Sequence, residues 1–185
     1  MLPPDSLTLK ESLEEDIIEI NDILNQFLDF ARGFQDEPKT PVNLGKLLKD
    51  IQTKHKRMGQ TFTLKKKNIR TDIPKKLFTD LRPLAFQRCL DNLINNAFQA
   101  CASVEKPLVQ ISTRKTETGI EITVSDNGPG IPDSIKDKIF QPFFTTKPTG
   151  QGTGLGLSLS YDIVKAHGGT LEVATTLSKG TVFKI

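Results

Sequence analysis

The amino-acid sequence predicts an α+β fold, a two-layer sandwich in which helices cover one face of a sheet, preceded by a long helix. Three observations predict this class of fold. Several short segments alternate apolar and polar residues, which indicates strands with one buried face. Longer segments place apolar residues at helical spacing. Near the N-terminus the apolar residues recur in steps of four and three, which predicts the long helix.

The N-terminal segment has the apolar seam of a coiled coil or helix bundle. Acidic residues lie between the seam positions, which are Leu13, Ile17, Ile20, Leu24, Phe27, Ala31 and Phe34. A lone helix cannot bury such a seam. We therefore expect it to pack on a second copy, another chain or a further helix; docking on its own domain is the alternative.

A polar segment with two prolines, residues 33–41, ends this helix and marks a boundary. We expect a helical region at 1–35, a linker at 36–41 and a domain at 42–185. Within the domain the patterns predict a long loop before residue 153 and the following elements: helices near 44–55, 81–102 and 155–166, and strands near 61–65, 108–114, 120–125, 170–175 and 181–185.

Composition restricts the class of protein. The chain has 185 residues, 36% of them hydrophobic, which suits one main core. No apolar run is long enough to span a bilayer, and no secretory leader is apparent, so we expect a cytoplasmic protein or the cytoplasmic part of a membrane-anchored one. Cys89 and Cys101 lie too far apart on one helix for a disulfide. The lysines between 46 and 76 lack interleaved aromatic residues, which favours a solvated face over nucleic-acid binding.

The helix predicted at 81–102 has an unusual polar side. Arg88, Asn92, Asn95, Asn96 and Gln99 gather there, opposite the apolar residues. Asn92 and Asn96 stand one turn apart, so their amide oxygens can point into the same space. Mg²⁺ is usually held by one or two such oxygens together with substrate phosphates. Taken alone, this stripe would more often be a solvated helix face.

Two further segments follow in order. The strand at 120–125 leads into Asp126-Asn127-Gly128-Pro129-Gly130, where a carboxylate could accept a hydrogen bond from an adenine amine or form an ordinary Asx turn. Later, IFQPFFTTK precedes the glycine-rich segment GQGTGLGLS at 150–158, which opens a helix. Backbone N–H groups there could cradle phosphates, although a flexible loop is the alternative.

Together these segments, in this order, resemble the N, G1, F and G2 boxes of the sensor histidine kinase catalytic domain. This domain belongs to the GHKL superfamily, which also includes gyrase, Hsp90 and MutL. The resemblance covers residues 42–185 and implies a Bergerat-type ATP-binding fold with a mixed, largely antiparallel sheet. It implies ATP and Mg²⁺ as cofactors and protein-histidine kinase activity in two-component signalling.

The resemblance also implies roles for individual residues. Asn96 resembles the Mg²⁺ ligand, and Asn92 and Lys147 resemble groups that act on the phosphates. Asp126 resembles the adenine contact, followed by the turn of Gly128, Gly130 and Ile131. The lid anchor and the phosphate-binding segment correspond to Phe143, Phe144, Gly152, Thr153, Gly154, Leu155 and Gly156.

The N-terminal helix is similar to the second helix of an EnvZ-type dimerisation and phosphotransfer hairpin. We expect a homodimer through this helix, and a response regulator as a further partner. The first helix and its phosphoacceptor are not in this sequence, and neither His55 nor His167 suits that role. Asn92 stands where gyrase-like ATPases have a glutamate, which favours a kinase. The alternatives are a GHKL ATPase, an anti-sigma-type serine kinase and a nucleotide-binding interaction module.

Overall fold

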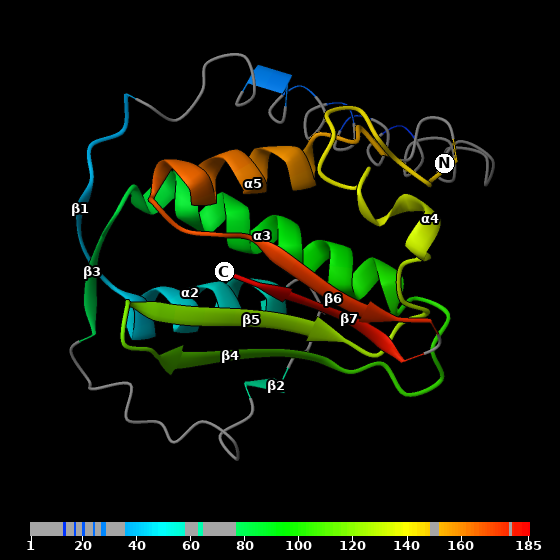
Figure 1. Cartoon of the computed structure of the whole chain (residues 1–185), viewed down its shortest axis with the longest axis horizontal. Helices are drawn as coiled ribbons and strands as arrows, with labels where there is room; N and C mark the ends of the chain where they lie inside the picture. Colours follow the sequence, from blue (N-terminus) through cyan, green and yellow to red (C-terminus); the bar gives the residue numbers. More distant parts are fainter. Residues whose placement is uncertain are drawn as a thin grey trace, which may run out of the picture.

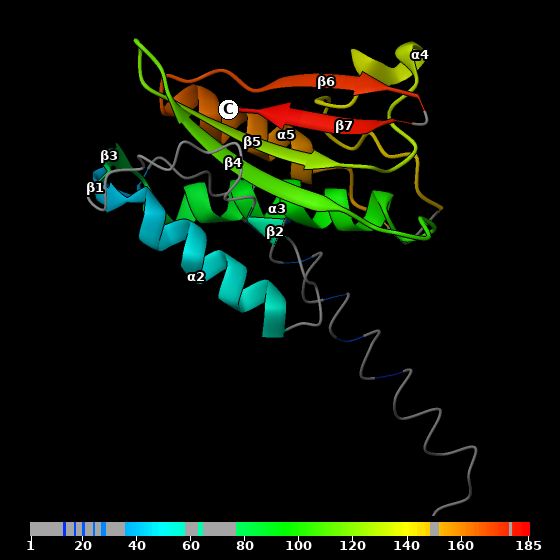
Figure 2. The same cartoon turned by 90° about the horizontal axis from the view of Figure 1, so that it is seen from below.

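The computed structural model describes residues 36–57, 63–64, 77–148, 152–177 and 179–185, together with single positions at 13, 17, 20, 24, 27 and 28. Helices cover one face of a five-stranded sheet, and a small second sheet lies at one end of the molecule, as Figures 1 and 2 show. This arrangement confirms the predicted α+β sandwich.

The main sheet is mixed and largely antiparallel, as the resemblance implied. Its strands lie in the order β2-β4-β5-β7-β6. The bounds are Thr63–Leu64 for β2, Val109–Lys115 for β4, Ile120–Asp126 for β5, Glu172–Thr176 for β6 and Gly180–Lys184 for β7. The pairing of β2 with β4 is parallel, and the other neighbours are antiparallel.

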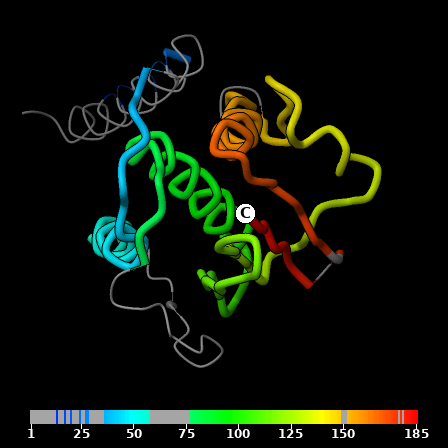
Figure 3. Tube along the Cα trace, turned by 60° about the vertical axis from the view of Figure 1, so that its left-hand side comes forward, coloured from blue at the N-terminus to red at the C-terminus, as the bar shows by residue number. Residues whose placement is uncertain are grey.

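Three helices form the second layer, and α3 (Pro83–Ala100) lies between α2 (Leu44–Arg57) and α5 (Gly156–Ala166) in Figure 3. The apolar side that the sequence predicts for α3 is its buried side. Phe86, Leu90, Leu93, Ile94, Ala97 and Cys101 are each at most 4% exposed. Cys89 and Cys101 are buried and free, as expected.

The prediction of a single sheet was wrong. β1 (Thr40–Asn43) and β3 (Phe78–Leu81) form a separate antiparallel pair. Each strand is only four residues long, so its alternation is too short to recognise, and the two are far apart in sequence. The long loop predicted before residue 153 also contains a short helix, α4 (Asp133–Lys136).

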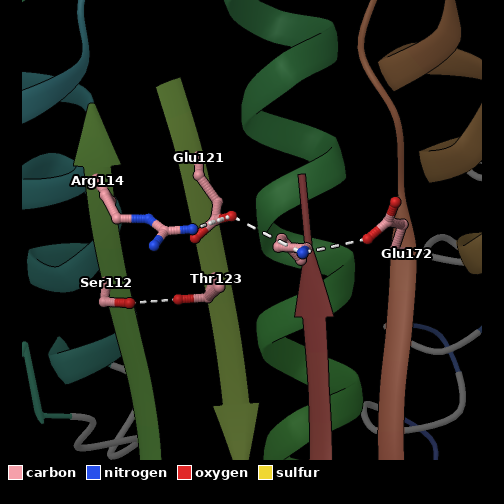
Figure 4. Close-up of polar contacts among 6 residues, drawn as sticks. Ser112, Arg114, Glu121, Thr123 and Glu172 are labelled. Carbon is pink, nitrogen blue, oxygen red and sulfur yellow. Dashed lines mark hydrogen bonds and ion pairs between the residues drawn. The ribbon is translucent and has the colours of Figure 1, made fainter. Parts of the chain in front are cut away.

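The face of the sheet that the helices leave uncovered carries a row of charged residues, shown in Figure 4. Glu121 on β5 accepts from Arg114 on β4 at 2.8 Å, and Lys184 on β7 lies 3.8 Å from Glu121 and 3.2 Å from Glu172 on β6. Ser112 and Thr123 are hydrogen-bonded beside them. Alternating charges across neighbouring strands keep this face compatible with water.

Apolar seam residues of the N-terminal segment are helical where the structure describes them. Leu13, Ile17, Ile20, Leu24, Phe27 and Leu28 are between 40% and 56% exposed. Ala31 and Phe34, the other predicted seam positions, lie outside the described residues. Among the described helices, none has the length and apolar character needed to span a membrane.

Glu37 provides the N-terminal cap of α3 from outside the helix. Its two carboxylate oxygens accept hydrogen bonds from the backbone N–H groups of Leu84 at 2.7 Å and Ala85 at 2.9 Å. The first turn of α3 has no acidic residue, and Arg82 at the N-cap makes no side-chain cap. Glu37 thus satisfies two helix-end donors and joins the segment before β1 to the helix that carries the asparagines.

We predict that Glu37→Ala lowers the free energy of unfolding by about 1 to 2 kcal/mol, because two N–H groups and the positive helix end lose their carboxylate. Urea unfolding followed by circular dichroism measures this change. Asp36→Ala is the matched control, since Asp36 is exposed and its side chain makes no hydrogen bond in the described part of the chain. Equal losses in the two variants would contradict the capping role.

Candidate functional site

A cavity of about 740 Å³ opens between α3, the end of β5 and the start of α5. Most of the site residues predicted from the sequence line it. They are Asn92, Asn96, Asp126, Gly130, Ile131, Phe144, Lys147, Gly152, Thr153, Gly154 and Gly156. The four sequence segments, which are separated by many residues, therefore meet around one space of a size that suits a nucleotide.

The asparagine side of α3 forms one wall. Asn92 Nδ2 donates to the carbonyl oxygen of Gly156 at 3.3 Å, so α3 is fixed to the start of α5 and the Asn92 amide is oriented. Asn96, one turn further along, makes no side-chain hydrogen bond to the described residues, and it lines the cavity. Its amide oxygen is therefore available to a cation.

The described residues contain no cluster of three His, Cys, Asp or Glu side chains that could hold a metal ion without other ligands. Mg²⁺ usually keeps several waters and combines one or two protein oxygens with substrate phosphates. The Asn96 amide is the group on α3 that fits such a partial coordination shell.

Asp126 lies at the end of β5 and is held by two backbone donors. Its Oδ1 accepts from Gly128 N at 2.9 Å and from Thr181 N at 3.2 Å. Burial raises the pKa of the Asp126 carboxyl, and the two N–H groups oppose that rise. Because Oδ1 is already occupied, Oδ2 is the acceptor that remains for a ligand in the cavity.

The two glycines after Asp126 have different functions. Gly130 has a φ of 77° and lines the cavity. Gly128 does not line it; a Cβ there would lie 2.9 Å from both the Cβ and the carbonyl oxygen of Ala100. Gly128 therefore lets the turn pack against the end of α3, which is a structural role. The predicted role of Gly128 in the turn next to adenine stays a prediction.

Residues 143–148 and 152–156 close the cavity from the other side. Phe144 lines the space, whereas Phe143 has a φ of 66° and is 63% exposed. Gly154, with a φ of 67°, lies so close to the Phe143 backbone that a Cβ would overlap it. Leu155 is 2% exposed and does not line the cavity. Neither Phe143 nor Leu155 lines the cavity. Both residues therefore contribute to the backbone conformation of this segment.

Several lining residues were not predicted from the sequence. They are Asn95, Gln99, Ala100, Pro129, Ile135, Ile139, Thr145, Thr146, Leu157, Thr181 and Phe183. Asn95 and Gln99 lie on the polar side that the sequence predicts for α3, and Thr145 and Thr146 lie in the FFTTK segment. These four residues could therefore have been assigned to the site by extending those patterns. Thr181 contributes its backbone N–H from a distant strand, for which the sequence contains no local signal.

Asp91 and His55 face each other on the side of α3 away from the cavity. Asp91 Oδ1 lies 2.9 Å from His55 Nε2, and Asp91 Oδ2 accepts from Lys54 Nζ at 2.8 Å. Burial alone would raise the pKa of Asp91, but hydrogen bonds from His55 and Lys54 outweigh it and leave the pKa lowered. Asp91 thus joins α3 to α2 and places no carboxylate in the cavity.

Neither histidine presents an available ring nitrogen in the manner of a phosphoacceptor. His55 is 1% exposed. His167 Nε2 accepts from Arg82 N at 2.9 Å, and its Nδ1 lies 2.7 Å from the carbonyl oxygen of Ile163. Burial lowers the pKa of His167, which suits a neutral ring with one acceptor nitrogen.

The α+β sandwich, the asparagine helix, the half-buried aspartate and the glycine-rich start of α5 together define the class of GHKL nucleotide-binding domains. Comparison of the sequence with known families agrees. The family of histidine kinase-, DNA gyrase B- and HSP90-like ATPases matches residues 82–185, more than half of the chain, and the chain belongs to this family.

Individual relatives are sensor kinases. The chain is 34% identical over 185 residues to the signal transduction histidine-protein kinase AtoS of Escherichia coli (strain K12), covering 97% of this chain and 28% of AtoS. The catalytic domain of the histidine kinase ThkA has 30% identity and a TM-score of 0.65, with 79% of this chain and 92% of that one covered. ThkA in complex with the response regulator TrrA has 24% identity and a TM-score of 0.72, and the match covers 100% of this chain and 52% of that one. This second likeness shows the fold alone.

Proposed function

We propose that this chain is the ATP-binding catalytic region of a two-component sensor histidine kinase, which transfers the γ-phosphate of Mg²⁺-ATP to a histidine on another segment or chain. The observation that carries the proposal is the cavity itself. It combines three asparagine amides, one half-buried aspartate and a glycine-rich helix start, while the carboxylate next to them on α3, Asp91, faces the opposite side.

Asp126 reads the adenine base in this proposal. Its Oδ2 accepts a hydrogen bond from the exocyclic amine, while Gly128 and Thr181 hold Oδ1 in place. A carboxylate selects adenine over guanine because guanine has a carbonyl oxygen where adenine has the amine. Ile131 and Phe144 supply apolar surface to the same cavity.

Asn92, Asn96 and Lys147 act on the phosphates. Asn96 would hold Mg²⁺ through its amide oxygen, and the ion when bound neutralises phosphate charge. Lys147 lines the cavity and brings an ammonium group to the γ-phosphate side, and the backbone of Gly152, Thr153, Gly154 and Gly156 surrounds the anion at the N-terminus of α5. Phosphoryl transfer needs mainly this positioning and charge stabilisation.

The nature of α3 supports a kinase over an ATPase. A water nucleophile requires a base, and the position one turn before Asn96 is Asn92, which is neutral and hydrogen-bonded to Gly156. A neutral imidazole already carries a lone pair and requires no strong base. Because His55 and His167 are both engaged within the domain, we place the acceptor histidine on a phosphotransfer hairpin.

The exposed seam of the N-terminal segment supports the partners in this proposal. Its five described residues, from Leu13 to Phe27, are too apolar and too exposed for an isolated helix. We propose that residues 1–35 form the second helix of the hairpin, that 36–41 link it to the catalytic domain at 42–185, and that the seam forms a homodimer. A response regulator would receive the phosphate, by analogy with the complex of ThkA with TrrA.

The proposal predicts that Asn96→Ala weakens Mg²⁺-ATP binding by about 10- to 100-fold, because the metal loses its protein ligand. Isothermal titration calorimetry with and without EDTA measures this effect and contains its own control. Chelation should weaken ATP binding to the parent chain and leave the variant almost unchanged. A variant that retains the parent's affinity and its response to EDTA would exclude Asn96 as the ligand.

A further inference from the structure

Lys147 crosses the cavity and contacts α3. Its Nζ donates to Gln99 Oε1 at 2.5 Å, and its backbone N–H donates to Thr145 Oγ1 at 3.1 Å. On the other side, a Cβ added at Gly152 would lie 2.9 Å from Lys147 Cδ, so the glycine-rich segment packs directly on the lysine stem. The Lys147 side chain therefore joins three parts of the cavity wall.

Gln99 stands on the same polar side of α3 as Asn96, three residues later and about 4.5 Å further along the helix axis. Gln99 lines the cavity and is exposed, so its amide contributes nothing to the core. In the described part of the chain its hydrogen bond is the one to Lys147. A side chain in this position can influence a ligand that binds in the cavity.

The chemistry of this pair differs from that of an ion pair. Lys147 is held by a neutral amide oxygen, and no carboxylate among the described residues contacts its ammonium group. Burial lowers the pKa of Lys147, which means that the charged form is incompletely compensated in this position. A carboxylate would bind the ammonium more strongly and would repel a phosphate, whereas a neutral amide oxygen leaves the positive charge available to an anion.

We propose that Gln99 is a positioning residue, which holds the Lys147 ammonium over the cavity through one of its three N–H donors and leaves the other two for a phosphate group of the bound nucleotide. This inference rests on the proposed function, since it takes a nucleoside triphosphate as the ligand. Gln99 acts through Lys147, and Lys147 contacts the substrate. Holding the lysine in advance reduces the ordering that ATP binding requires.

A double-mutant cycle tests the proposal. Gln99→Met keeps the length of the side chain and removes the acceptor, and Lys147→Met removes the ammonium. Calorimetry with Mg²⁺-ATP should give about fivefold weaker binding for Gln99→Met, the equivalent of one net hydrogen bond, but no further weakening when Lys147 is already methionine. Equal weakening by Gln99→Met in both backgrounds, or none in the parent, would overturn the positioning role.

A second measurement is independent of nucleotide. The pKa of Lys147, measured by nuclear magnetic resonance of its ε-position in the chain without ATP, should fall in Gln99→Met and rise in Gln99→Glu. An unchanged pKa in both variants would show that Gln99 does not hold the ammonium. Failure of the proposed function has a different signature: the parent chain would not bind Mg²⁺-ATP, whereas the Lys147 pKa would still respond to the Gln99 variants.

Discussion

Asp126→Asn is expected to weaken ATP binding by about 100-fold and to reduce the preference for ATP over GTP. The substitution keeps the shape of the side chain, but each orientation of the amide creates a conflict. If the amide oxygen stays on Gly128 N and Thr181 N, the amide nitrogen faces the adenine amine, and two donors meet. If the amide is flipped, its nitrogen faces the two backbone donors.

Competition of ATP and GTP for a fluorescent nucleotide measures both the affinity and the base preference. Asp91→Asn is the matched control, because it removes a carboxylate from the other side of the same nucleotide-binding domain, where Asp91 contacts His55 and Lys54. This control should leave ATP affinity near that of the parent. If Asp126→Asn discriminated between ATP and GTP as the parent does, Asp126 would not be the base contact.

Much of the fold could be predicted because its elements are locally encoded. The apolar side of α3 and the alternation of β4 and β5 repeat over enough residues to define their buried faces. β1 and β3 were missed because each has four residues, and Pro41 lies within β1. Their pairing depends on contacts between distant segments, which a local pattern does not encode.

The same distinction applies to the site. Asn92, Asn96 and Asp126 were found because each lies in a contiguous segment with an unusual composition. The hydrogen bond from Lys147 to Gln99 joins residues 48 positions apart, and that from Thr181 to Asp126 joins residues 55 apart. Glu37 caps α3 across 47 positions. Such contacts are set by the packing of the sheet against the helices, so the sequence alone could not indicate them.

The largest effect is expected for phosphate transfer itself. The chain alone should bind Mg²⁺-ATP and incorporate no phosphate, whereas a two-helix hairpin with a phosphoacceptor histidine, whose second helix has the sequence of residues 1–35, should become phosphorylated when mixed with it. Both histidines of the chain make intramolecular contacts that block them, since His55 is 1% exposed and His167 uses both ring nitrogens. Labelled ATP and gel autoradiography measure the transfer.

Two controls test the acceptor histidine and the nucleotide site separately. A hairpin in which the acceptor histidine is alanine should remain unlabelled, and the Asn96→Ala chain should transfer phosphate more slowly to the intact hairpin, because phosphoryl transfer depends on the metal and its positioning. Acid-labile, base-stable phosphate on the chain alone, lost in either His55→Ala or His167→Ala, would identify that histidine as the acceptor. In that case the domain would have to release His55 from Asp91, or His167 from Arg82, before the reaction.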